Sequence, residues 1–150
     1  MHKPHITLAC VVHCQGKFLF VEEFEYGKMT LNQPAGNLEA NESLVEGAER
    51  ELFEETGIKA KMQSLLGIYQ WQAPQSGIDY LRFIFIVELD QCLPTQPQDT
   101  DINRALWLTL GEVQEYIQQP NQCLRNPLVL EVINDYLSGK KFPLTILQQY

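Results

Sequence analysis

Three glutamates on one short segment have the spacing that divalent-metal chemistry requires. Glu51 is followed by Glu54 and Glu55, three and four residues later, so on a helix the three carboxylates share one face. Like charges this close repel one another, and a bound cation would relieve the repulsion. A hard ion such as Mg²⁺ takes carboxylate, water and phosphate oxygens as ligands. The spacing therefore predicts a Mg²⁺ site, with Mn²⁺ as an alternative ion, that serves a phosphorylated substrate.

Arg50 lies beside this face and four residues before Glu54. Its guanidinium can hold a carboxylate through forked hydrogen bonds or contact a phosphate directly, and the first role is favoured within such an acidic cluster. The alternative interpretation is an ordinary solvated helix face. That alternative requires alternating charges, yet Arg50 is the only basic residue between Glu39 and Glu55.

The acidic segment has the start and stop signals of a helix. Ser43 followed by Glu46 is typical of a capping box, and Gly57 is typical of a helix end. These signals predict a helix of about 13 residues between them. The preceding residues 32–42 contain Pro34, Gly36 and two asparagines without hydrophobic periodicity, which predicts a loop.

The rest of the chain alternates between strand-like and helix-like patterns. We expect a hairpin of Ile6–Val12 and Lys17–Glu22 around Gln15-Gly16, a short strand at Met29–Leu31, a second hairpin of Ile58–Trp71 and Tyr80–Leu89, a strand at Ala105–Leu108, a helix after Thr109, and a helix from Pro127 to near Gly139. This order predicts an α+β fold in which helices sandwich a mixed sheet.

Size and charge narrow the class of protein further. A chain of 150 residues predicts one domain over 1–150. The net charge of -8 argues against nucleic acid as a partner, since phosphate neutralisation needs clustered Lys and Arg. No apolar run is long enough for a membrane span, and no secretory leader precedes the first strand. We therefore expect a cytoplasmic protein.

The four cysteines, Cys10, Cys14, Cys92 and Cys123, include no C-x-x-C pair and sit in or beside apolar segments. This pattern predicts buried thiols instead of disulfide bridges or zinc ligands. A reducing compartment follows from that expectation.

The segment from Gly36 to Ile58 resembles the Nudix box. Its fixed positions are filled by Gly36, Glu42, Arg50-Glu51, Glu54-Glu55 and Gly57, with apolar residues at 52 and 58. The resemblance implies a Nudix fold and metal-dependent hydrolysis of a phosphoanhydride. It also implies that Glu54 and Glu55 are principal metal ligands and that Glu51 is a further ligand or the base.

The same resemblance assigns supporting roles to the neighbouring positions. Arg50 orients Glu51, the carbonyl oxygen of Ala35 adds a metal ligand, and Glu42 supports Arg50 or the loop. Gly36 and Gly57 are structural. Outside the box, Asp101 lies six residues before Trp107, where family members often carry an acidic ligand or base. Asp101 can equally serve as a loop cap.

A narrower bacterial group of the family shares further segments with this chain. These are residues 3–7, 32–36, 70–71, 81–83, 94–97 and 127–129. The likeness implies release of orthophosphate from nucleoside tri- and diphosphates, thiamine pyrophosphate and hydroxymethylpyrimidine pyrophosphate. The partner is then a small pyrophosphate, and we expect a monomer.

Four residues are candidates for substrate contacts. Trp71 and Phe83 can stack on a ring, whereas Arg82 and Gln33 can bind phosphates or a base edge. The competing interpretation places the aromatic residues in the core and pairs Arg82 with a carboxylate. His5 and His13 flank the first strand and are expected to be structural, because metal-activated water needs no imidazole base.

Two rival functions stay open at this point. Within the fold, the rival is a hydrolase of nucleoside diphosphate sugars, dinucleotides or oxidised nucleotides. In another class, the rival is a module that senses a nucleotide without cleaving it. The complete set of three box glutamates argues against such a sensor.

Overall fold

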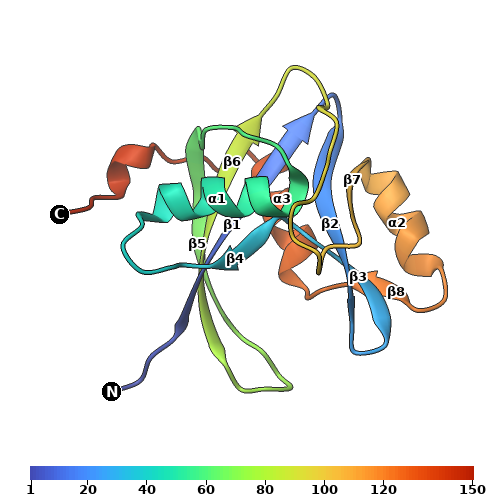
Figure 1. Ribbon diagram of the computed structural model, residues 1–150, viewed down its shortest axis with the longest axis horizontal. Helices are drawn as coiled ribbons and strands as arrows, with labels where there is room; N and C mark the ends of the chain where they lie inside the picture. Colours follow the sequence, from blue (N-terminus) through green and yellow to red (C-terminus); the bar gives the residue numbers. More distant parts are fainter.

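An eight-stranded mixed sheet forms the middle of the computed structural model, which describes residues 1–150 (Figure 1). The strands are β1 (His5–Cys14), β2 (Lys17–Glu25), β3 (Lys28–Asn32), β4 (Ala35–Asn37), β5 (Ser64–Gln72), β6 (Asp79–Glu88), β7 (Arg104–Leu108) and β8 (Gln122–Leu124). Their order is β5-β6-β1-β2-β3-β8, with β4 paired to β1 and β7 paired to β2. Strands β1 and β6 run parallel, whereas β1 and β2 form an antiparallel hairpin.

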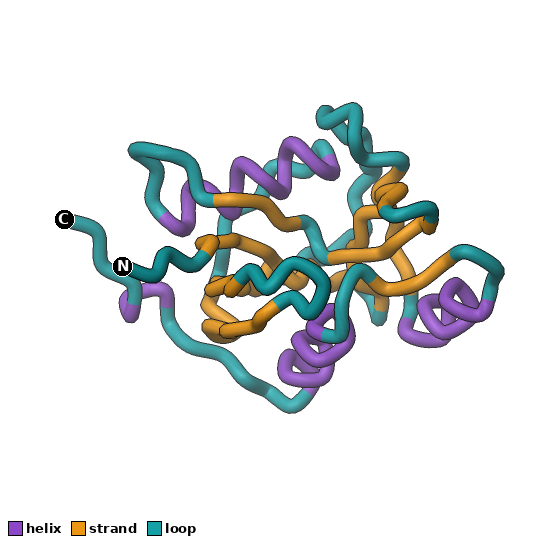
Figure 2. The backbone as a smooth tube through the Cα atoms, turned by 90° about the horizontal axis from the view of Figure 1, so that it is seen from below, coloured by secondary structure: helices purple, strands orange, loops and turns teal.

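Helices cover both faces of this sheet, as Figure 2 shows. Helix α1 (Leu44–Thr56) packs on β1 and β4, and α3 (Leu128–Leu137) packs on β1 and β5. Helix α2 (Leu110–Gln118) lies beside β7 and β8, and the short 3-10 helix η1 (Leu144–Ile146) follows α3. The expected α+β fold with a sheet between helices is confirmed.

The central strand β1 is apolar on both faces because each face is covered. Successive strand side chains point to opposite sides of a sheet. Leu8, Cys10 and Val12 therefore join a core cluster with Ala48 and Leu52 of α1. The intervening Ala9 and Val11 belong to a second cluster, which includes Val129, Val132 and Ile133 of α3. This anchoring fixes the position of α1 relative to the end of β1.

Local sequence signals predicted the hairpin and the helix ends correctly. Gln15 and Gly16 have φ values of 49° and 77°, the left-handed pair that a tight two-residue hairpin needs. Helix α1 has the expected 13 residues, and α2 carries the capping box of Thr109 and Glu112.

The structure corrects several boundaries. Residues 58–63 are not strand, the expected loop at 32–42 contains β4, and β8 and η1 had no clear sequence signal. Helix α3 ends at Leu137, before Gly139. Strand β4 is three residues long and exists because it pairs with Thr7–Ala9 of β1. Such pairing is a tertiary contact that local patterns do not report.

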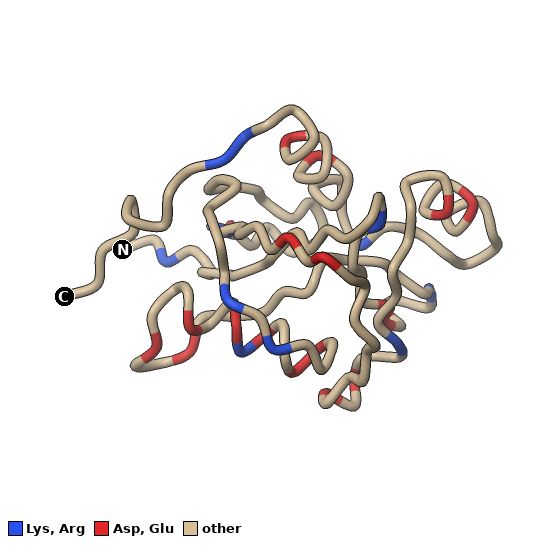
Figure 3. The backbone as a smooth tube through the Cα atoms, turned by 90° about the horizontal axis from the view of Figure 1, so that it is seen from above, with Lys and Arg blue, Asp and Glu red and all other residues tan.

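The hydropathy of the helices and the distribution of charged residues describe the surface of the fold. None of the helices is both long and apolar enough to cross a membrane. Figure 3 shows basic positions dispersed over the backbone and outnumbered by acidic ones.

Candidate active site

The caps at the two ends of helix α1 fix the position of its acidic face. The Ser43 side chain accepts a hydrogen bond from the Glu46 amide, and Gly57 ends the helix in the left-handed conformation with φ 77°. A Cβ at Gly57 would lie 2.4 Å from the carbonyl oxygen of Gln96, so only glycine allows this approach. The helix thereby presents Arg50, Glu51 and the following carboxylates to the loop before it.

Arg50 forms hydrogen bonds with three glutamates. Its Nε and Nη2 donate to the two carboxylate oxygens of Glu42 at 2.9 and 2.8 Å. Its Nη1 donates to Glu51 at 2.8 Å and to Glu54 at 3.1 Å. The hydrogen bonds from Arg50 lower the pKa of Glu42 despite partial burial. The forked contact of Arg50 is thus with Glu42, which holds the guanidinium in place, while Nη1 holds Glu51 and Glu54 by one hydrogen bond each.

The Glu51 carboxylate lies so close to the backbone of β4 that position 36 has no room for a side chain. A Cβ built on Gly36 would lie 2.1 Å from Cδ of Glu51. Burial is the largest influence on Glu51 and raises its pKa, which the contact with Arg50 only partly offsets. Gly36 is therefore structural in the sense that it leaves room for the Glu51 carboxylate.

Glu55 is the carboxylate that Arg50 does not reach. Its Oε1 accepts a hydrogen bond of 2.8 Å from the Ala35 amide, and it forms no ion pair. Burial raises the pKa of Glu55 to about 8, and the negative charges of Glu51, Glu23 and Asp99 act in the same direction. A buried carboxylate among like charges is stabilised by a cation.

The donor set of this face fits a divalent cation chemically. Glu51, Glu54 and Glu55 offer hard oxygen donors, which Mg²⁺ and Mn²⁺ prefer. The side chains do not converge into a ready-made cluster of three ligands, because Glu51 and Glu54 turn toward Arg50. Glu55 has no cationic partner, and its raised pKa shows that its surroundings disfavour the charged form, which a bound cation would favour.

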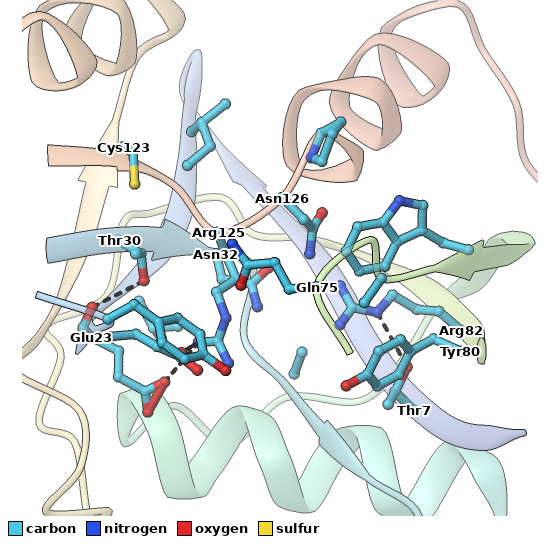
Figure 4. A pocket seen from close by; sticks show the side chains of 18 of the residues that line it. Thr7, Glu23, Thr30, Asn32, Gln75, Tyr80, Arg82, Cys123, Arg125 and Asn126 are labelled. Atoms are coloured by element: carbon cyan, nitrogen blue, oxygen red, sulfur yellow. Dashed lines mark hydrogen bonds and ion pairs between the residues drawn. The ribbon is translucent and has the colours of Figure 1, made fainter. Parts of the chain in front are cut away.

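A cavity of about 730 Å³ opens directly beside Glu55. It lies between the tip of the β2–β3 hairpin and the β5–β6 hairpin, and the segment after β8 closes a third side (Figure 4). Glu55, Ala35 and Gly36 line the cavity at its acidic end. The volume is sufficient for a ligand of small-molecule size.

Two of the expected substrate-contact residues, Trp71 and Arg82, line this cavity. Trp71 stacks on Tyr80 with ring centroids 6.0 Å apart. Arg82 donates from Nε to the Thr7 hydroxyl at 3.2 Å and has no carboxylate partner. Burial lowers the pKa of Arg82 to about 10, with a further contribution from the charge of Arg125. An arginine without an ion pair in a cavity wall is suited to an anionic group.

The other two expected substrate-contact residues lie outside the cavity. Gln33 is buried and donates to the carbonyl oxygen of Val129 at 2.7 Å, which ties the chain after β3 to α3. Phe83 packs against the core cluster beneath α1. Both side chains therefore have packing roles, as the competing interpretation of the aromatic residues allowed for Phe83.

The acidic loop before β7 is tied to α1 through Asp99 instead of Asp101. The amide of Asp99 donates to the carbonyl oxygen of Glu54 at 2.8 Å, and Asp99 raises the pKa of Glu55. Asp101 is exposed, and its amide donates to the Asp99 side chain. The Asp99 side chain thus performs the loop-capping role by accepting a hydrogen bond from the Asp101 amide.

The Nudix box did not predict the part of the cavity wall that β2 and Arg125 form. Glu23 and Glu25 line the cavity with Val21, and Arg125 forms ion pairs with both glutamates. Their alternate spacing on one strand was the available signal, because residues two apart share a face. The partner Arg125 lies about 100 residues later in the chain, where spacing carries no information.

The cysteine expectation was wrong for one pair. Cys14 and Cys92 form a disulfide with a Cα–Cα distance of 5.5 Å, whereas Cys10 and Cys123 are free. The parallel pairing of β1 with β6 brings the ends of these strands together, although the two cysteines are 78 residues apart. The argument from cysteine usage to a reducing compartment therefore loses its basis.

The two histidines of β1, His5 and His13, make aromatic contacts. His5 meets the edge of Tyr80, and His13 packs against Phe18 and Tyr136. Neither lines the cavity.

Comparison with known proteins defines the class of this chain. The family model described as the NUDIX domain matches residues 1–126, which include the whole acidic helix and the cavity wall up to Asn126. The chain belongs to the Nudix family and is a Nudix hydrolase. Members of this family generally use divalent metal cations and act on small molecules.

The chain is also similar to individual members of the family over almost its whole length. The chain is 51% identical over 150 residues to the phosphatase NudJ of Escherichia coli K12, covering 100% of this chain and 94% of that protein. A solved Nudix hydrolase from Nitrosomonas europaea is 41% identical with a TM-score of 0.87, covering 99% of this chain and 98% of that one. The chain is thus a homologue of the phosphatase NudJ.

A more distant structure supports the fold alone. The Nudix domain of Shewanella oneidensis NrtR, solved with ADP ribose, is 18% identical with a TM-score of 0.71 and covers 91% of this chain and 90% of that one.

Proposed function

We propose that this protein is a Mg²⁺-dependent pyrophosphohydrolase that releases phosphate from small pyrophosphates. The observation that carries the proposal is Glu55, a part-buried carboxylate in the cavity wall without an ion-pair partner. A cation placed there can interact with the phosphate oxygens of a ligand in the cavity. Mn²⁺ has the same preference for oxygen donors and is the alternative ion.

The box residues then take distinct roles. Glu54 and Glu55 would hold the metal, the carbonyl oxygen of Ala35 would add a ligand, and Glu51 would be a further ligand or the base for the attacking water. Arg50 keeps the Glu51 carboxylate in position through its 2.8 Å hydrogen bond. When bound, a divalent ion would supply Lewis-acid stabilisation of charge on the phosphoryl oxygens and would make a neighbouring water easier to deprotonate.

The loop before β7 supplies acidic residues at the edge of this site. Asp101 was expected there as a ligand or base, and we propose that Asp99 is the better candidate. The reason is that the negative charge of Asp99 acts on Glu55, while the Asp99 amide holds the loop to the carbonyl oxygen of Glu54 at 2.8 Å.

The cavity residues bind the rest of the substrate. Arg82 is suited to a phosphate group because it has no carboxylate partner. Trp71 and Tyr80 offer a stacked aromatic surface for a ring. Gln33 and Phe83 support the walls from behind.

Resemblance to NudJ suggests which pyrophosphates are cleaved. We propose nucleoside tri- and diphosphates, thiamine pyrophosphate and hydroxymethylpyrimidine pyrophosphate as substrates. The alternative is a hydrolase of nucleoside diphosphate sugars, dinucleotides or oxidised nucleotides, for which the distant NrtR domain with ADP ribose is a precedent in fold only. A non-catalytic sensor is disfavoured because Arg50 and all three box glutamates are present. We further propose one domain over 1–150 that works as a monomer.

A phosphate-release screen tests the proposal. Each candidate pyrophosphate is incubated with the protein in Mg²⁺, Mn²⁺ or chelator, next to nucleoside diphosphate sugars. We expect metal-dependent release from the proposed substrates, loss of at least about 100-fold in kcat in Glu55→Gln, and ordinary activity in Glu46→Gln. Glu46 is a matched control because it lies on the exposed first turn of the same helix. Turnover confined to nucleoside diphosphate sugars would support the alternative, and equal activity in both variants would contradict the role of Glu55.

A further inference from the structure

The loop between β6 and β7, residues 89–103, docks on the C-terminal end of helix α1 through its backbone (Figure 1). A helix leaves its last carbonyl groups without partners. Three amides of the loop donate to such carbonyl oxygens at 2.8–2.9 Å: Gln96 to Thr56, and Gln98 and Asp99 to Glu54. Because Glu55 lies between the two accepting residues, the docked loop fixes the turn that carries the proposed metal ligands.

Side-chain packing contributes little to this docking. No side chain from Leu89 to Asp101 is buried, and burial resumes only at Ile102. Segments with few buried contacts open more readily than the core of a protein. The first half of the loop is held by single hydrogen bonds: Leu89 to His13, Gln15 to Asp90, Trp107 to Leu93 and Thr95 to Ala105.

The Cys14–Cys92 disulfide adds a covalent anchor to this loop. Cys14 ends β1, the strand on which α1 packs, and is fully buried, whereas Cys92 is half-buried. Cys92 lies four residues before Gln96, the first residue that bonds the helix. The disulfide therefore limits how far the loop can move away from the end of α1.

We propose that the Cys14–Cys92 disulfide is a redox-sensitive switch that controls metal binding by the acidic face of α1. The oxidised protein holds the loop against the last turn of the helix. Reduction frees the start of the loop, the amides of Gln98 and Asp99 leave the helix more often, and affinity for a divalent cation falls. This inference rests on the proposed function, which supplies the metal site, and adds regulation to it.

A dithiol such as dithiothreitol supplies the two electrons and two protons that the reduction needs. Its thiolate attacks Sγ of Cys92, the more exposed of the two cysteines, and the Cys14 sulfur leaves and takes up a proton. The second thiolate of the reductant then attacks the mixed disulfide. Cys92 leaves and takes up the other proton, and the reductant becomes a cyclic disulfide.

Hydrogen exchange followed by NMR tests the movement of the loop without metal. The wild-type protein is compared in chelator before and after reduction with dithiothreitol. We expect the amides of Gln98 and Asp99 to exchange at least about fivefold faster after reduction. The reference is the Ala73 amide, which donates to Ile78 in the turn between β5 and β6, and its rate should not change. Equal rates for the loop amides in both forms would overturn the inference.

Mn²⁺ binding followed by electron paramagnetic resonance tests the effect on the metal site. The reduced protein is freed of reductant without air before the titration. We expect reduction to raise the Kd for Mn²⁺ at least about fivefold. Coupling is reciprocal, so saturating Mn²⁺ should make the reduction potential of the cysteine pair more negative by about 20 mV, the equivalent of fivefold for two electrons. A bond that only stabilises the fold would change neither quantity.

Cys92→Ala is the matched variant, because it removes the bond and keeps the other three cysteines. It should bind Mn²⁺ like the reduced wild type and should not respond to dithiothreitol. If this variant does not fold, re-oxidation of the reduced wild type with a small disulfide should restore tight binding. Failure of either expectation would overturn the inference.

The failure of this inference differs from the failure of the proposed function. Equal Mn²⁺ affinity in the oxidised and reduced wild type would overturn the inference and leave the proposed function intact. No Mn²⁺ binding by either form would contradict the proposed function and the inference together.

Discussion

The carboxylate of Glu51 occupies the space where a side chain on Gly36 would begin. The distance from a Cβ at position 36 to Cδ of Glu51 would be 2.1 Å, well below any permitted contact. Gly36 lies in β4, which pairs with β1, and Glu51 lies on α1, which packs on the same two strands. The sheet and the helix are thus fixed at a separation that only glycine permits.

Gly36→Ala should impair catalysis more than folding. The added methyl group displaces the Glu51 carboxylate, and misplacing a reacting group by about 1 Å can cost 100-fold in rate. We expect kcat for pyrophosphate hydrolysis to fall by about that factor, while circular dichroism shows a folded protein. Gly111→Ala is the control, since a Cβ there meets only the Thr109 hydroxyl oxygen at 3.8 Å. Equal kcat in both variants would contradict the steric argument.

Replacement of Arg50 by lysine should separate charge from geometry. The guanidinium bonds Glu42, Glu51 and Glu54 simultaneously, whereas an ammonium group is a point charge without a fork. Arg50→Lys is therefore expected to lower kcat by about 10- to 100-fold although the net charge is unchanged. Lys61→Arg, at a site with 91% side-chain exposure, should leave kcat as it is. Full activity in Arg50→Lys would contradict this prediction, because it would show that a positive charge at position 50 is sufficient for catalysis.

The metal-free protein should lose stability as pH rises through the neutral range. Burial raises the pKa of Glu55 from 4.5 to about 8, so the folded state holds a proton that the unfolded state has released. The corresponding stabilisation is complete below pH 4.5 and is lost as pH rises to about 8, by on the order of a few kcal/mol. Urea unfolding in chelator from pH 5 to 9 measures this slope. Glu55→Gln should flatten the slope, and an identical slope in that variant would contradict the assignment.

Glu22 is expected to stabilise the fold in the opposite pH direction. It is 2% exposed and accepts hydrogen bonds from Arg104, Asn103 and Tyr116. Burial alone would raise its pKa, but these hydrogen bonds together lower it. Its contribution is therefore complete above the ordinary carboxyl pKa and is lost as pH falls through the lowered value.

Glu22→Gln should therefore reduce the free energy of unfolding at neutral pH. We expect a loss of about 1–3 kcal/mol, since the contact with Arg104 loses its charge assistance. The difference from wild type should shrink in acid, where Glu22 is itself neutral. Glu115→Gln on the exposed face of α2 is the control. A difference in the free energy of unfolding that does not change with pH would contradict this prediction, because it would show that the shape of the Glu22 side chain and not its charge stabilises the fold.

Local signals were sufficient to predict the acidic helix and the hairpins. The Ser43 cap, the left-handed Gly57 and the Gln15-Gly16 turn each depend on a few neighbouring residues, and the structure has all three. The spacing of Glu51, Glu54 and Glu55 also follows from helical geometry alone. The placement of Arg50 among them was predictable because the helix brings position 50 next to position 54.

The parts that could not be predicted depend on contacts between distant segments. Strands β4 and β8 form only because β1 and β3 accept them, and Cys14 meets Cys92 only through the pairing of β1 with β6. The cavity is likewise assembled from segments that lie far apart in the chain. No spacing rule links Glu23 with Arg125, so the cavity wall that they share became visible only in the folded chain.

Metal binding by the acidic face of α1 is the claim on which the function depends. Electron paramagnetic resonance of Mn²⁺ titrated into the protein measures this binding directly, without substrate or turnover. We predict that the wild-type protein binds Mn²⁺ and that the variant Glu54→Gln/Glu55→Gln binds it at least about tenfold more weakly, equivalent to about 1.4 kcal/mol, with Glu46→Gln unchanged. Equal Mn²⁺ affinity in the wild type and the double variant would contradict the account.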